Sequence, residues 1–140
     1  MNRFILAAAA FAAVIGCSSN GSKPWPDLHP AKGSITVDGQ TPSGGYVSLH
    51  GDDPSVADVI VSGRVEADGK FTLNTVHATE KNSPTKAGAP AGTFKVRFMP
   101  PANGDQATGT SVDPIDGKSP VTIKPGDNEL KIELNKPRKK

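Results

Sequence analysis

The sequence predicts an all-β protein: a seven-stranded antiparallel β-sandwich preceded by an N-terminal leader. Apolar and polar residues alternate with a period of two along most of the chain after residue 31, the pattern of strands with one buried face. Turn-forming Asp-Gly and Pro-Gly pairs separate these stretches, and no stretch after residue 17 carries a helical period. The 15 glycines, 13 prolines and few aromatic residues suit short strands joined by turns.

Each of the seven expected strands carries apolar side chains on one face and polar side chains on the other. In chain order the apolar residues are Ile35 and Val37; Val47 and Leu49; Val61 and Val65; Phe71 and Leu73; Phe94, Val96 and Phe98; Val121 and Ile123; and Leu130, Ile132 and Leu134. Because one-sided strands must cover their apolar faces, two antiparallel sheets packed face to face are expected.

The turns are predicted from the residues between these strands. Asp38-Gly39 and Pro125-Gly126 mark two turns, and Asp68-Gly69 predicts a tight hairpin over residues 65–73, because Asp-Gly accepts the positive φ that such a turn requires. Residues 52–58 have room for one turn of helix at most. Residues 76–91 and 99–119 are expected to be long connections, a length that is uncommon without a functional role.

Residues 1–16 have the parts of a secretory signal peptide. Basic Arg3 precedes an apolar stretch from Phe4 to Gly16. As a helix this stretch would rise only about 20 Å, too little to cross roughly 30 Å of hydrocarbon. It ends in Val14-Ile15-Gly16-Cys17, which resembles the lipobox of bacterial lipoproteins. The resemblance implies that Cys17 is lipidated and becomes the first residue of the mature protein.

The cysteine count agrees with a lipid anchor at Cys17. Cys17 is the only cysteine, so an exported form could make no intramolecular disulfide. Lipidation explains such an odd cysteine, whereas a free thiol would remain open to oxidation. Ser18 and Ser19 follow, with no Asp at the second mature position. By resemblance to sorting rules of Gram-negative bacteria, this favours the outer membrane of the cell envelope.

We expect residues 17–31 to be the lipidated cysteine and a flexible tether, residues 32–135 one domain, and residues 136–140 a basic tail. Three prolines stiffen the tether. Trp25 lies between two of them, and we interpret it as packing onto the domain edge rather than as an interfacial aromatic or ligand platform.

Charge gives little support for nucleic-acid binding. Removing the leader leaves 15 basic against 14 acidic side chains, and four of the positive charges lie in the last five residues, so the remaining body is mildly acidic. The tail could attract anionic lipid head groups or could be a solvated end. Without a basic patch interleaved with aromatic residues, nucleic acid is not expected as a partner.

Several turn and core segments resemble the carboxypeptidase regulatory-like domain, which has a transthyretin-like sandwich. They are Gly33-Ser-Ile-Thr-Val-Asp-Gly-Gln-Thr-Pro42, Gly45-Tyr-Val-Ser-Leu, Ala67-Asp-Gly-Lys-Phe-Thr-Leu73, Gly88-Ala-Pro-Ala-Gly92-Thr-Phe-Lys-Val96 and residues 120–134. In the fourth segment Phe94 replaces the usual Tyr. Residues 120–134 look like the last strands of small lipoproteins of planctomycete-type bacteria. The resemblance spans roughly residues 32–135 and implies a non-catalytic accessory or adhesion-like module.

The sequence contains no strong catalytic or metal-binding pattern. His29, His50 and His77 lack the spacing of a zinc site, and no Gly-x-Ser-x-Gly nucleophile motif occurs. His50 with Asp52 and Asp53 could hold a metal loosely, although a polar face running into an acidic loop is favoured. Asp113 and Asp116, with Asp105 nearby, could bind calcium, but an ordinary turn is favoured. We therefore expect no catalytic residue, metal or cofactor.

The favoured function is that of a non-enzymatic, lipid-anchored cell-envelope protein whose sandwich has a structural or protein-interaction role. The alternative is a carbohydrate- or peptide-binding module on the cell surface, with Trp25 and Tyr46, the only Trp and Tyr in the chain, as the aromatic platforms. An enzyme is the third and least favoured hypothesis.

Overall fold

Strands dominate the part of the protein that its structure describes. The structure is a computed structural model, which describes residues 24–101 and 113–136. Within those residues there is no α-helix, and a 3₁₀ turn, η1 (Pro54–Val56), is the single helical element. The strands are β1 (Leu28–His29), β2 (Ala31–Val37), β3 (Tyr46–Gly51), β4 (Val59–Arg64), β5 (Lys70–Thr72), β6 (Asn74–His77), β7 (Lys86–Ala87), β8 (Ala89–Pro90), β9 (Gly92–Met99), β10 (Ile115–Asp116), β11 (Val121–Ile123) and β12 (Asn128–Leu134).

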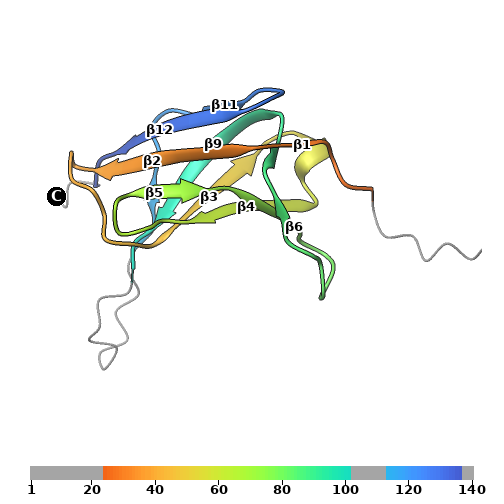
Figure 1. The fold of residues 1–140 in the computed structure, drawn as a ribbon, viewed down its shortest axis with the longest axis horizontal. Helices are drawn as coiled ribbons and strands as arrows, with labels where there is room; N and C mark the ends of the chain where they lie inside the picture. Colours follow the sequence, from red (N-terminus) through yellow and green to blue (C-terminus); the bar gives the residue numbers. More distant parts are fainter. Residues whose placement is uncertain (1–23, 102–112, 137–140) are drawn as a thin grey trace, which may run out of the picture.

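Two sheets form the layers of the fold (Figure 1). The large sheet has the order β10-β9-β3-β4-β6-β7, with β11 also paired to β9. The small sheet has the order β12-β2-β5, and β1 and β8 form a separate two-stranded ribbon. The expected all-β, sandwich-like architecture is confirmed.

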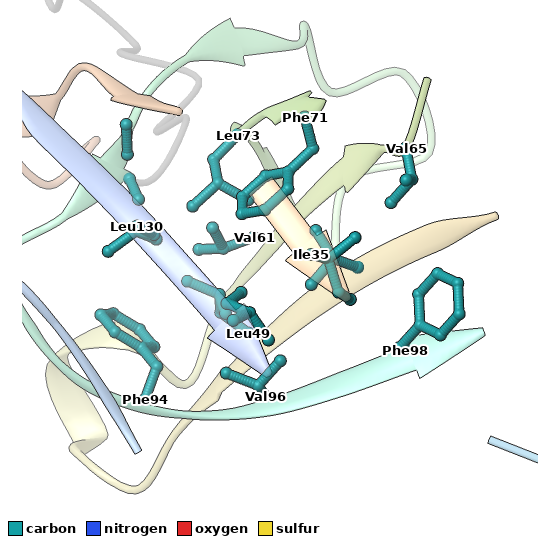
Figure 2. Close-up of a cluster of buried hydrophobic side chains, with 14 of the residues drawn as sticks. Ile35, Leu49, Val61, Val65, Phe71, Leu73, Phe94, Val96, Phe98 and Leu130 are labelled. Atoms are coloured by element: carbon teal, nitrogen blue, oxygen red, sulfur yellow. The ribbon is translucent and has the colours of Figure 1, made fainter. Parts of the chain in front are cut away.

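Side chains from both sheets fill the space between the layers. Figure 2 shows Ile35 of β2 and Leu130 of β12 in the same cluster as Leu49 and Val61 of the large sheet. On β9, Phe94, Val96 and Phe98 are buried while the residues between them are exposed. This alternation is the one predicted from the sequence, and β2, β3, β4, β5, β9, β11 and β12 correspond to the seven expected strands.

The last strand departs from the expected antiparallel pairing. Strand β12 runs parallel to β2, from Asn128 opposite Ala31 to Leu134 opposite Val37, whereas the other strand pairs are antiparallel. The turn before β12 carries the chain from the large sheet to the small one, so β11 and β12 are not hairpin partners. The Asn128 side chain closes that turn, accepting from Lys124 N at 2.8 Å and donating to Lys124 O at 2.8 Å.

The predicted hairpin over residues 65–73 is confirmed as a turn but not as a two-stranded ladder. Gly69 has a φ of 77°, and Glu66 N donates to Lys70 O at 2.8 Å. However, β4 belongs to the large sheet and β5 to the small sheet, and a single bridge between Val65 and Phe71 joins the two arms. The turn is therefore a corner at which the chain changes layer.

Parts of the expected connections and tether are also strands. Residues 76–91 contain the end of β6 together with β7 and β8, and β10 lies within residues 99–119. At the N-terminal side, β1 pairs with β8 and β2 begins at Ala31. The expected flexible tether thus gives way to ordered strands before residue 32. Its earlier residues, up to 23, lie outside the described part of the chain, as do residues 102–112 and 137–140.

Gly33 lies where β2 and β12 approach each other under the Phe71 ring. A Cβ at this position would be 2.3 Å from Leu130 O and 2.8 Å from Phe71 Cζ. We predict that Gly33→Ala destabilises the fold by about 1–3 kcal/mol, the usual cost of overpacking. Urea denaturation followed by circular dichroism measures this, with Ser34→Ala, on the outer face of β2, as the matched control expected within about 0.5 kcal/mol of wild type. Equal midpoints for the two variants would contradict the prediction.

Candidate functional site

The outer face of β9, β3 and β4 gathers the exposed large hydrophobic side chains of the described residues. Tyr46 is 57% exposed, Ile60 47% and Met99 44%. Tyr46 on β3 lies directly between Met99 on β9 and Arg64 on β4, and Ile60 is further along β4 on the same face. The inner face of these strands is core, so the alternation of each strand turns this second set of side chains outward. We call this surface the open face.

Polar and charged groups occupy the middle of the open face. Arg97 Nε donates to Asp116 Oδ1 at 2.7 Å, and Lys95 Nζ is 2.8 Å from Asp52 Oδ2. The hydrogen bond from Arg97 lowers the pKa of Asp116 from its ordinary value of 3.8. Because the pair is favoured only while Asp116 is ionised, it is present at neutral pH and opens when acid protonates the carboxylate. Both side chains are about half exposed or more, so water screens the attraction.

Ser48 and His50 form a hydroxyl–imidazole pair on this face. Ser48 Oγ is 3.1 Å from His50 Nε2, a separation that a nucleophile and its base also show. A triad would need a carboxylate on the other ring nitrogen to orient the base. Asp52 is held by Lys95 and Asp116 by Arg97. The described residues therefore do not assemble a triad around His50.

Asp52, Asp53 and Asp116, which were considered and disfavoured as metal ligands, have other partners in the structure. Asp53 caps η1 by accepting from Ser55 N at 2.8 Å, a bond that lowers the pKa of Asp53, while Asp52 turns to Lys95. Asp116 is engaged with Arg97, and Asp105 lies outside the described residues. Within residues 24–101 and 113–136 no group of three His, Cys, Asp or Glu side chains is placed to hold a metal ion.

Trp25 is docked on the domain, which confirms the interpretation that it packs at the domain edge. Its ring lies 4.2 Å from the His77 ring between centroids, at a tilt of 55°. Lys86 Nζ lies 4.4 Å from the centre of the indole ring, within the range of a cation–π contact. His77 is 4% exposed, and neither of its ring nitrogens has a hydrogen-bond partner in the described chain. The Trp25 ring is therefore in contact with the protein itself.

A cleft of about 590 Å³ lies beside β5 where the small sheet meets β4. Positive charge comes from Lys32, Arg64 and Lys70, and negative charge comes from Glu66 and Glu129. Ser34, Thr72 and Asn74 contribute polar groups. The cleft suits a polar ligand bearing both signs of charge. The cleft could not be predicted from the sequence, because its residues come from five strands and one connection that are separate along the chain.

The comparisons with known proteins leave the family open. No family model, curated protein or solved structure matches the chain. Cys17, the predicted lipidation site, lies outside the described residues. Among the described residues there is no helix of the length and apolar character needed to cross a bilayer.

Because Trp25 is the only tryptophan, its fluorescence reports directly on its docking. We predict that His77→Ala shifts the emission to longer wavelength, since the indole loses its ring partner and gains water. Lys86→Ala should have a smaller effect, because an exposed cation–π contact contributes about 0.5–1 kcal/mol. His50→Ala, on the open face, is the control and should leave the spectrum unchanged. If the His77 variant kept the wild-type emission while retaining its circular dichroism, the docking would be refuted.

Proposed function

We propose that the protein is a lipid-anchored component of the bacterial cell envelope whose β-sandwich acts as a non-catalytic protein-interaction module. The basic, apolar and small-residue pattern of residues 1–17 supports export and lipidation at Cys17. Two or more acyl chains are needed for stable anchoring, because one chain binds a bilayer weakly. The sandwich-like fold is compatible with the resemblance to carboxypeptidase regulatory-like, transthyretin-like domains. The Ser18-Ser19 sequence favours the outer membrane.

The observation that carries the interaction role is the pair of neighbouring exposed side chains Tyr46 and Met99 on the open face, with exposed Ile60 further along β4. Single exposed apolar residues are common on protein surfaces, whereas a group of them on one surface marks a contact site. Aromatic residues, Met and Arg are also enriched at protein interfaces, and Tyr46 lies between Met99 and Arg64. A protein is therefore the kind of partner that suits this face.

A carbohydrate- or peptide-binding module is the second candidate, and Tyr46 is the observation that favours it. The Tyr46 side chain is 57% exposed on the open face, with polar Ser48 on the same strand. Trp25, the other aromatic platform considered, is engaged with His77. A sugar site on this protein would accordingly be centred on Tyr46.

The lipid anchor predicts the behaviour of a Cys17→Ser variant. Metabolic labelling with palmitate should be lost, because no other cysteine is present to accept a lipid, and the protein should leave the membrane fraction. Ser18→Ala is the control and should retain both. Labelling that survives in the Cys17→Ser variant would refute the anchor.

The open face predicts where a partner can be cross-linked in cells. A photo-reactive phenylalanine analogue replacing Tyr46 or Ile60 should yield adducts with another envelope protein, whereas the same analogue at Lys124, in the turn before β12, should not. An equal adduct yield at all three positions would contradict a role for the open face.

A glycan array probed with wild type and with Tyr46→Ala tests the second candidate. Binding to defined glycans that is lost in the variant would favour carbohydrate recognition.

A further inference from the structure

Strand β12 has one unpaired edge along its full length of seven residues. Two hydrogen bonds fix its orientation: Asn128 N donates to Pro30 O at 2.9 Å, and Leu134 O accepts from Asp38 N at 2.8 Å. The even-numbered residues of β12 therefore direct their backbone groups toward β2. Backbone groups of neighbouring residues point in opposite directions in a strand, so those of Glu129, Lys131 and Glu133 point away from β2. No strand of the described chain pairs with them.

This edge differs from the other sheet edges of the protein. Strands β7 and β10 have two residues each, and β5 and β11 have three. Short edges of this kind offer little template for another strand. By contrast, β12 is long, contains no proline and has no bulge in its pairing with β2. Its free edge can accept a ladder of backbone hydrogen bonds from an added strand.

Space for an added strand lies beside the β12 edge. A groove of about 360 Å³ runs between β12 and the connection of residues 117–121. Val96 and Val121 of the large sheet and Ile132 and Leu134 of β12 contribute its apolar lining. Apolar side chains of both sheets are thus accessible in a groove next to the β12 edge.

The charges on β12 select the occupant. Exposed Glu129, Lys131 and Glu133 alternate in sign along the outer face of the strand. In an antiparallel pair, side chains opposite each other on one face interact, and opposite charges stabilise the pair while like charges destabilise it. A strand that places Lys opposite Glu133 and Glu opposite Lys131 is therefore complementary, and β12 itself is such a strand when it is read in the reverse direction.

We propose that β12 pairs antiparallel with β12 of a second copy of the chain, with Ile132 opposite Ile132 of the second copy. This register places Lys131 opposite Glu133 of the second copy at both symmetry-related positions, and Glu129 opposite the neutral Asn135. It also keeps the outward backbone groups of the two strands facing each other.

Two neighbouring registers also keep the outward backbone groups facing each other, but they place like charges opposite each other across the two strands. With Lys131 at the two-fold axis, it would face Lys131 of the second copy, and Glu129 would face Glu133. With Leu130 at the axis, the two attractions between Lys131 and Glu129 would be offset by two repulsions between Glu133 and Asp127. The favoured dimer has a two-fold axis, as a self-complementary interface requires, and joins two three-stranded sheets into one of six strands.

A charge-swap experiment tests both the surface and the register. The full chain is purified in a mild detergent, and its mass is measured by sedimentation in density-matched solvent over a range of concentrations. Lys131→Glu alone and Glu133→Lys alone each create two like-charge pairs in the dimer. Each should weaken dimerisation about tenfold or more, since a cross-strand charge pair contributes roughly 0.2–1 kcal/mol and each substitution changes two attractions into two repulsions. The double variant Lys131→Glu with Glu133→Lys should recover the dimer.

Two further variants separate pairing from folding. Lys131→Pro removes an N–H that points away from β2, so the fold should survive while the dimer is lost. Lys95→Glu, on the open face, is the matched charge reversal and should leave the dimer intact. Circular dichroism verifies that each variant is folded. A wild-type chain that is monomeric at every concentration would overturn the proposal. So would a dimer that Lys131→Pro does not affect, or a double variant that fails to recover; the last of these results would assign the edge to a different extended peptide.

Discussion

The fold depends on the pairing between β2 and β12. Strand β2 is the middle strand of the small sheet, and β12 supplies Leu130, Ile132 and Leu134 to the layer that covers the large sheet. Without β12 the layer would contain only β2 and the three residues of β5. Such a pair of strands is marginal in water, and the inner side chains of β9 and β3 would lose their cover. Close approach of the two strands is possible because Gly33 has no side chain to separate them.

The two outer faces that result from this packing have different chemical characters. The small sheet turns charged residues such as Lys32, Lys131 and Glu133 outward, whereas the large sheet exposes Tyr46 and Met99 side by side. The β12 edge and the open face therefore suit different contacts: hydrogen-bonded strand addition at the edge, and burial of apolar surface at the open face. The two contacts involve different strands, β12 for one and β9, β3 and β4 for the other.

The sequence was informative about which side chains are buried and much less so about which strands are neighbours. Phe94, Val96 and Phe98 could be placed in the core from alternation alone, since burial follows the pleat of a single strand. The parallel direction of β12 could not be predicted, because the same alternation fits either direction. Apolar–polar alternation did not predict strand β6, because its inward residues, Thr75 and His77, are polar. Their burial relies on contacts made by distant segments, such as the bond from Thr75 Oγ1 to Gly88 O.

The same limits explain what could be foreseen of the candidate site. Trp25 and Tyr46 are the only Trp and Tyr in the sequence. In the structure Trp25 contacts His77, and Tyr46 is exposed on the open face. Met99 and Ile60 carried no such signal, because they join Tyr46 only through the order of strands in the sheet.

The contact of β2 with β12 also has a consequence for biogenesis. Ala31 and Asn128 are opposite each other although most of the domain separates them along the chain, and contacts so distant in sequence form slowly. During synthesis β2 must therefore wait, unpaired on that side, until β12 has left the ribosome.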